Sequence, residues 1–160
     1  TDGQIFLESD LFFSGMRPAV NVGLSVSRVG GAAQTKAMKK ASGSIRIDLA
    51  QYREMEIFTQ FSSDLDDNTR AQLTYGKSLM ELLKQPLCHP LSMHEQVMTL
   101  VMANNGVFDE IPTKEVKKHQ TELLEFIDLK HPEIGKQIED KKEINDELVK
   151  NILEAVKEFA

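Results

Sequence analysis

The chain has 160 residues, of which 41% are hydrophobic and 28% are charged, a composition typical of a soluble globular domain. Its formal net charge is −6, so the sequence lacks the basic excess of a nucleic-acid-binding protein. The longest apolar stretch, residues 97–103, is far shorter than the ~20 residues that span a membrane, and the single cysteine, Cys88, excludes a disulfide within the chain. We therefore expect neither a nucleic-acid partner nor direct membrane insertion.

Residues 1–35 combine short segments of different kinds. We expect a strand at 3–8, a helical turn at 10–13 and extended chain at 18–20 and 24–26. The run Val29-Gly30-Gly31 ends this pattern, which places Arg28 on a short loop. Because the sequence has no initial Met and opens on a strand-like run, we expect it to be the tail end of a longer chain.

From about residue 32 onward, apolar residues recur at the three- and four-residue spacing of amphipathic helices. Helices are expected at 32–40, at 45–61, from the acidic turn at 62–67 to just before Pro86, from the Ser92–Glu95 capping box to 102, from Pro112 to about 131, and over 144–159. Pro132 ends one helix or begins another. The predicted fold class is mostly α, with a helical bundle at residues 36–160 after a short α/β piece at residues 1–35.

Arg28 carries the clearest chemical signal. Residues 1–40 contain five Lys and Arg against three Asp and Glu, whereas the remainder contains 14 basic and 22 acidic residues, which favours an anion site near the N-terminus. An arginine on a rigid loop presents a fixed, always charged fork to phosphate oxygens, as an arginine finger does in nucleotide hydrolysis. An isolated Ser-Arg pair, however, is more often a surface arginine with a solvent or carboxylate partner.

Other chemistry is not indicated. The sequence has no Gly-x-x-x-x-Gly-Lys-Ser/Thr motif, so we do not expect it to hold phosphate and Mg²⁺ by that route. Its four histidines lack the spacing of metal ligands, and no metal site is expected.

Several sequence blocks are distinctive: TDGQIFL at 1–7, RPA at 17–19, GLSVSRVG at 23–30, LAQYRE at 49–54 and SDLD at 63–66. Together they resemble the alpha subunit of rotary ATP synthases, nearly continuously over residues 1–84 and mainly in helical pattern beyond residue 90. The resemblance implies that residues 1–35 are the truncated end of a nucleotide-binding domain and that residues 36–160 are the C-terminal helical bundle.

The resemblance also implies roles for residues near Arg28. Arg28 would reach across a subunit interface to the terminal phosphate in the catalytic site of a neighbouring beta subunit. Val26 and Ser27 would line that interface, and Ser25 would support activity by holding the segment that carries Arg28.

A second, non-catalytic nucleotide site is implied within the alpha subunit itself. Arg17, Pro18 and Gln85 would lie near the adenine of that nucleotide, where Leu87 replaces a second glutamine common in the family. ATP or ADP with Mg²⁺ would be the cofactor of the intact subunit. We expect no bound nucleotide in this part of the subunit, because the phosphate-binding loop would lie upstream. We also expect no enzymatic activity from this part in isolation.

The implied partners are the beta subunits of the catalytic ring and the gamma subunit of the central stalk. The acidic turn at 63–66 would face the stalk, although it equally fits an ordinary turn between helices. The implied location is a peripheral complex of bacterial type on the cytoplasmic face of the cell membrane.

Two alternatives remain open from sequence. The chain could belong to a secretion-type or flagellar export ring ATPase or to a catalytic beta-type subunit, but beta subunits have a longer acidic loop and lack the block around Arg28. It could also be a free-standing helical interaction module without any link to nucleotides.

Overall fold

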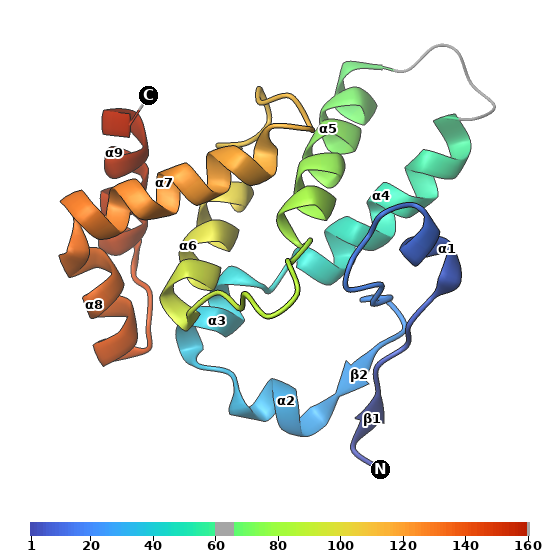
Figure 1. The fold of residues 1–160 in the computed structure, drawn as a ribbon, viewed down its shortest axis with the longest axis horizontal. Helices are drawn as coiled ribbons and strands as arrows, with labels where there is room; N and C mark the ends of the chain where they lie inside the picture. Colours follow the sequence, from blue (N-terminus) through green and yellow to red (C-terminus); the bar gives the residue numbers. More distant parts are fainter. Residues whose placement is uncertain (60–65, 160) are drawn as a thin grey trace.

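The computed structural model describes residues 1–59 and 66–159. The elements in chain order are β1 (Gly3–Gln4), α1 (Ser9–Phe13), β2 (Val26–Ser27), α2 (Arg28–Ala33), α3 (Lys36–Ala41), α4 (Ile45–Thr59), α5 (Asp67–Leu82), α6 (Met93–Asn104), α7 (Val116–Lys130), α8 (Pro132–Lys141) and α9 (Asp146–Phe159). Figure 1 shows the long helices gathered into a bundle, with α2 and the strands to one side. The predicted mostly α fold with a helical bundle and a small strand-containing segment is confirmed.

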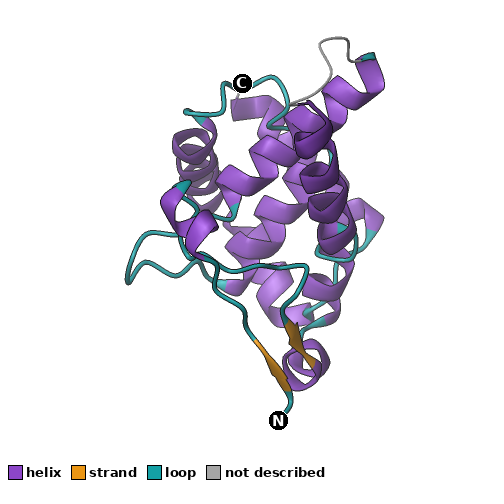
Figure 2. Ribbon diagram, turned by 90° about the vertical axis from the view of Figure 1, so that its right-hand side faces the viewer, coloured by secondary structure: helices purple, strands orange, loops and turns teal. Residues whose placement is uncertain are grey.

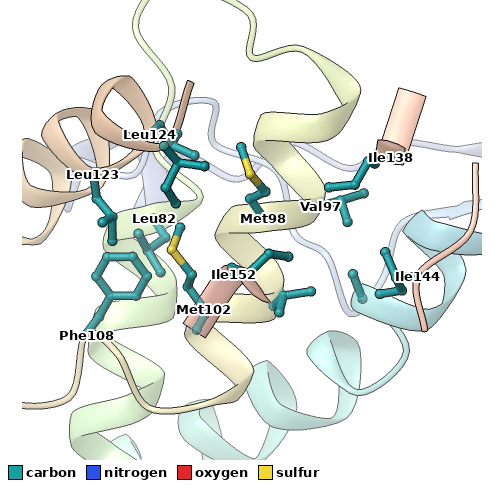
Figure 3. Packing of buried hydrophobic residues seen from close by; sticks show 14 of the residues in the cluster. Leu82, Val97, Met98, Met102, Phe108, Leu123, Leu124, Ile138, Ile144 and Ile152 are labelled. Atoms are coloured by element: carbon teal, nitrogen blue, oxygen red, sulfur yellow. The ribbon is translucent and has the colours of Figure 1, made fainter. Parts of the chain in front are cut away.

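Helix α6 lies at the centre of the bundle and contacts α3, α5, α7, α8 and α9. Its apolar residues point in several directions, and Val97, Met98 and Met102 are fully buried (Figure 3). A helix that is apolar on most of its circumference is stable only when other helices cover it. Burial of each such side chain stabilises the fold by about 1.5–3 kcal/mol. The core of the chain is therefore built around α6.

The helix ends follow from local sequence. In the predicted capping box, the Ser92 hydroxyl accepts from the Glu95 N–H and the Glu95 carboxylate accepts from the Ser92 N–H at 2.6 Å. Pro132 is the first residue of α8, so it begins a helix directly after α7. Helix α7 begins at Val116, later than predicted, because the Glu115 N–H bonds to the Pro112 carbonyl in a turn that precedes the helix.

The N-terminal segment differs in detail from its prediction. The strand is shorter than residues 3–8: only Gly3–Gln4 pairs with β2, antiparallel, and Leu7 forms an isolated bridge with Val20. The predicted helix at 32–40 divides into α2 and α3, because the Thr35 hydroxyl accepts from the Met38 N–H and begins a new helix there. Figure 2 shows the strands at the end of the molecule where the chain begins.

The prediction that Arg28 lies on a loop is wrong. Arg28 is the first residue of α2, and Gly30 and Gly31 lie inside that helix. Glycine disfavours a helix, but the Ser27 hydroxyl accepts from the Gly30 N–H and caps the first turn. The cap offsets part of the cost of the glycine pair.

Helices α4 and α5 approach closely at Gly76. A Cβ added at Gly76 would lie 2.3 Å from the ring of Tyr52, a buried residue of α4. We expect Gly76→Ala to lower the free energy of unfolding by about 1–3 kcal/mol, because the crowded atoms belong to the inner part of the Tyr52 side chain and cannot move aside cheaply.

Gly31→Ala is the matched control for this substitution. Its added Cβ would have no neighbour within 4 Å, and alanine favours a helix by about 1 kcal/mol over glycine, so stability should hold or rise. Urea unfolding followed by circular dichroism measures both variants. An unchanged stability for Gly76→Ala would show that the two helices do not pack as described.

Candidate functional site

Arg28 lies at the surface of the molecule. Its side chain is 81% exposed, and its closest charged neighbour is Asp2, whose Oδ1 lies 4.0 Å from Arg28 Nε. That distance is too long for a hydrogen bond, so the guanidinium keeps its donors available for another molecule.

Asp2 and Ser27 fix the start of α2, on which Arg28 lies. The Ser27 hydroxyl donates to Asp2 Oδ2 at 2.7 Å, and the Val29 N–H donates to Asp2 Oδ1 at 2.9 Å. The hydrogen bond from Ser27, followed by that from the Val29 N–H, lowers the pKa of Asp2 below its usual value. The carboxylate also suits the positive end of the helix dipole. The first turn of α2 is thus held by a residue that lies 25 positions before the capping Ser27.

Ser25 and Asn21 hold the segment that leads into β2. The Ser25 hydroxyl donates to the Asn21 carbonyl at 2.6 Å and accepts from the Phe6 N–H at 3.0 Å. Asn21 is buried, donates to Glu8 Oε1 at 2.6 Å and accepts from the Leu24 N–H at 3.0 Å. Sequence reasoning identified Ser25 but missed Asn21, although a polar residue between two valines was a signal.

Many large apolar side chains of the N-terminal segment are exposed at the surface of the molecule. Val26, assigned to an interface by sequence resemblance, is 47% exposed. The other exposed apolar residues of the N-terminal segment are Ile5, Phe6, Leu7, Phe12, Phe13, Leu24 and Val29. Exposed apolar residues in such number are typical of a surface that contacts another protein or another domain.

Arg17, Pro18 and Gln85 lie together although they are far apart in the sequence. The Gln85 N–H donates to the Arg17 carbonyl at 2.9 Å, and the Arg17–Pro18 peptide bond is cis. The Arg17 guanidinium lies over the Phe12 ring, 4.4 Å from its centroid, a contact that sequence reasoning missed. Leu87, two residues beyond Gln85, is 90% exposed.

Most of the acidic turn at 63–66 lies outside the described residues. Asp66 is described: its Oδ1 accepts from the Thr69 N–H at 2.7 Å and caps α5, and this bond lowers the pKa of Asp66. Within residues 1–59 and 66–159, no three His, Cys, Asp or Glu side chains gather closely enough to hold a metal ion. In the same residues, no helix has both the length and the apolar character needed to cross a bilayer.

The fold and the site define a helical-bundle domain with an attached N-terminal segment that exposes an arginine among apolar side chains. Residues 34–159 match the family described as the ATP synthase alpha/beta chain, C terminal domain, and the chain belongs to this family. Membership implies assembly with other subunits of an ATP synthase ring.

The capping role of Asp2 gives α2 a dependence on pH. Because the folded pKa of Asp2 is lowered, its stabilisation is complete above the ordinary value of about 4 and is lost as pH falls through the folded value. The amide signal of Val29 in NMR spectra should therefore shift in a step below about pH 4, when the carboxylate that accepts its N–H becomes protonated. Asp2→Asn should remove the step, and a flat Val29 shift in the unmodified chain down to about pH 2 would contradict the cap.

Proposed function

We propose that the chain is the C-terminal part of a non-catalytic, alpha-type subunit of a rotary ATP synthase and that Arg28 is its arginine finger. The supporting observation is the exposed guanidinium of Arg28 at the capped start of α2, within a segment rich in exposed apolar side chains. The sequence block around Arg28 and the short acidic turn favour an alpha-type over a beta-type subunit.

The proposed chemistry follows from charge. In phosphoryl transfer, negative charge develops on the oxygens of the transferred group, and a fixed guanidinium stabilises it through paired hydrogen bonds. Arg28 does this for a nucleotide held by a neighbouring beta subunit. Ser25, Ser27 and Asp2 position it, and Val26 contributes apolar contact at the same interface.

The proposal assigns the adenine of a second nucleotide to Arg17, Pro18 and Gln85. The side-chain amide of Gln85 has no partner among the described residues, and a glutamine amide matches the donor and acceptor of an adenine edge. These residues fit the base alone. The phosphates and Mg²⁺ of ATP or ADP belong to a loop that this sequence does not contain.

The remaining parts of the proposal concern organisation. Residues 1–35 belong to a nucleotide-binding domain, and residues 36–160 form the C-terminal bundle, whose acidic turn at 63–66 faces a gamma-type stalk. The beta and gamma subunits are the partners, and the complex is peripheral, on the cytoplasmic face of the membrane.

Substitution of Arg28 in the assembled complex tests the central assignment. Arg28→Ala should leave assembly and nucleotide binding intact but lower multisite ATP turnover roughly 10³-fold or more, because an arginine finger contributes about that factor. Arg28→Lys keeps the charge but not the fork and should also lose most turnover.

Lys118→Ala is the control for loss of an exposed cation, since Lys118 lies on α7 and pairs with Glu122. Its turnover should match the unmodified complex. Steady-state ATP hydrolysis at saturating nucleotide measures all three variants. Normal turnover of Arg28→Ala would reject the assignment.

The adenine assignment has a separate test. Gln85→Ala should weaken retention of ADP at the non-catalytic site about fivefold, the effect of one hydrogen bond. Leu87→Gln, which introduces a second amide nearby, should tighten it by a similar factor. Both are measured as nucleotide retained by the complex after gel filtration. If neither substitution changes retention, the adenine lies elsewhere.

A further inference from the structure

A cavity of 440 Å³ lies between α5, α6, α7 and the segment that joins α5 to α6. Leu82, Leu91, Leu100 and Leu124 give it an apolar wall, and Leu82 and Leu124 extend into the bundle from α5 and α7 (Figure 3). Its size is in the range of small-molecule sites, roughly 300–1,000 Å³. Gln85, assigned above to the adenine, borders this cavity, whereas Arg17, Pro18 and Arg28 do not.

Gln120 of α7 gives this cavity an unsatisfied hydrogen-bonding group. Its side chain is 1% exposed, and its Nε2 donates to the hydroxyl of Thr99, a buried residue of α6, at 2.9 Å. Its Oε1 is buried and has no hydrogen-bond partner among the described residues. In either orientation of the amide, the Thr99 hydroxyl can bond to its nitrogen or to its oxygen but not to both. Both residues border the cavity, so a ligand there can supply the missing partner.

The charges at the edge of the cavity favour a ligand that is neutral or positive. Both of its lysines have partners within the chain: Lys84 pairs with Glu81, and Lys117 donates to the Leu82 carbonyl at 3.2 Å. Glu125, by contrast, borders the cavity and has no hydrogen-bond or ion-pair partner within the described part of the chain. An unpaired carboxylate attracts a cation and repels an anion.

We propose that this cavity binds a planar, largely apolar small molecule that carries an N–H donor and a positive charge. The N–H donates to the amide of Gln120, the ring lies against the leucines, and the cation faces Glu125. The site is independent of the proposed arginine finger, and it uses neither a nucleotide nor a second subunit.

Tryptamine and 1-methyltryptamine are suitable probes, because both carry a flat ring and an ammonium group and only the first has the indole N–H. NMR titration of the full chain should show shifts of amides in α6 and α7, near Thr99 and Gln120. Tryptamine should bind about fivefold more tightly, the effect of one hydrogen bond. Equal affinities, or no shifts from either probe at low-millimolar concentration, as for a cavity filled only by water, would overturn the proposal.

Two variants separate the contributions of the amide and the carboxylate. Gln120→Met keeps the volume and should make the two probes equal in affinity. Stability should change little, because the loss of a buried unpaired carbonyl is set against the loss of the hydrogen bond to Thr99. Glu125→Gln should weaken both probes several-fold, whereas Glu122→Gln, on the same helix but outside the cavity, should not. If Gln120→Met does not fold, the two probes on the unmodified chain still decide the question. A preference for tryptamine that persists in folded Gln120→Met would overturn the role of the amide.

Discussion

Burial of α6 is the constraint on which the rest of the structure depends. Val97, Met98 and Met102 are fully buried, so helices must cover α6 around most of its circumference. The helix that precedes it, α5, packs against it, and residues 83–92 connect the two helices. That segment carries Gln85, whose N–H binds the Arg17 carbonyl. Packing at the centre thereby fixes where the N-terminal segment attaches.

The N-terminal segment is held in a different way. It contributes little to the core, and hydrogen bonds of buried Asn21 and of Ser25 within the segment fix its shape. Its apolar side chains are mostly exposed, which is the reverse of the arrangement in the bundle. A segment of this kind is ordered by polar contacts within the chain and leaves its apolar surface for a partner. The two proposed sites differ in the same way. The Arg28 site lies on the exposed surface of the N-terminal segment, whereas the proposed ligand site lies in a cavity of the bundle.

The bundle could be predicted from sequence because its signals are local. A capping box, a proline at a helix start and apolar residues four positions apart each act within one or two turns of helix. Helix α2 was not predicted although its Ser27 cap is local, because the Gly30-Gly31 pair is typical of a loop and the Asp2 carboxylate that also accepts from its first turn is distant in sequence. The contact of Arg17 with Phe12 was not foreseen either, because it forms across the end of α1 and follows no helical spacing. Gln120 lies in a helix that the sequence predicts, but its unpaired amide depends on which residue of α6 lies opposite.

The arrangement of Asp2 bears directly on what Arg28 can do. A carboxylate that formed two hydrogen bonds with the guanidinium would occupy the fork and neutralise it. Here both oxygens of Asp2 accept from other donors, the Ser27 hydroxyl and the Val29 N–H. The carboxylate therefore orients the helix that carries Arg28 without binding the guanidinium at hydrogen-bond distance. A positioned and exposed cation with its donors available is the state required for recognition of an anion on another molecule.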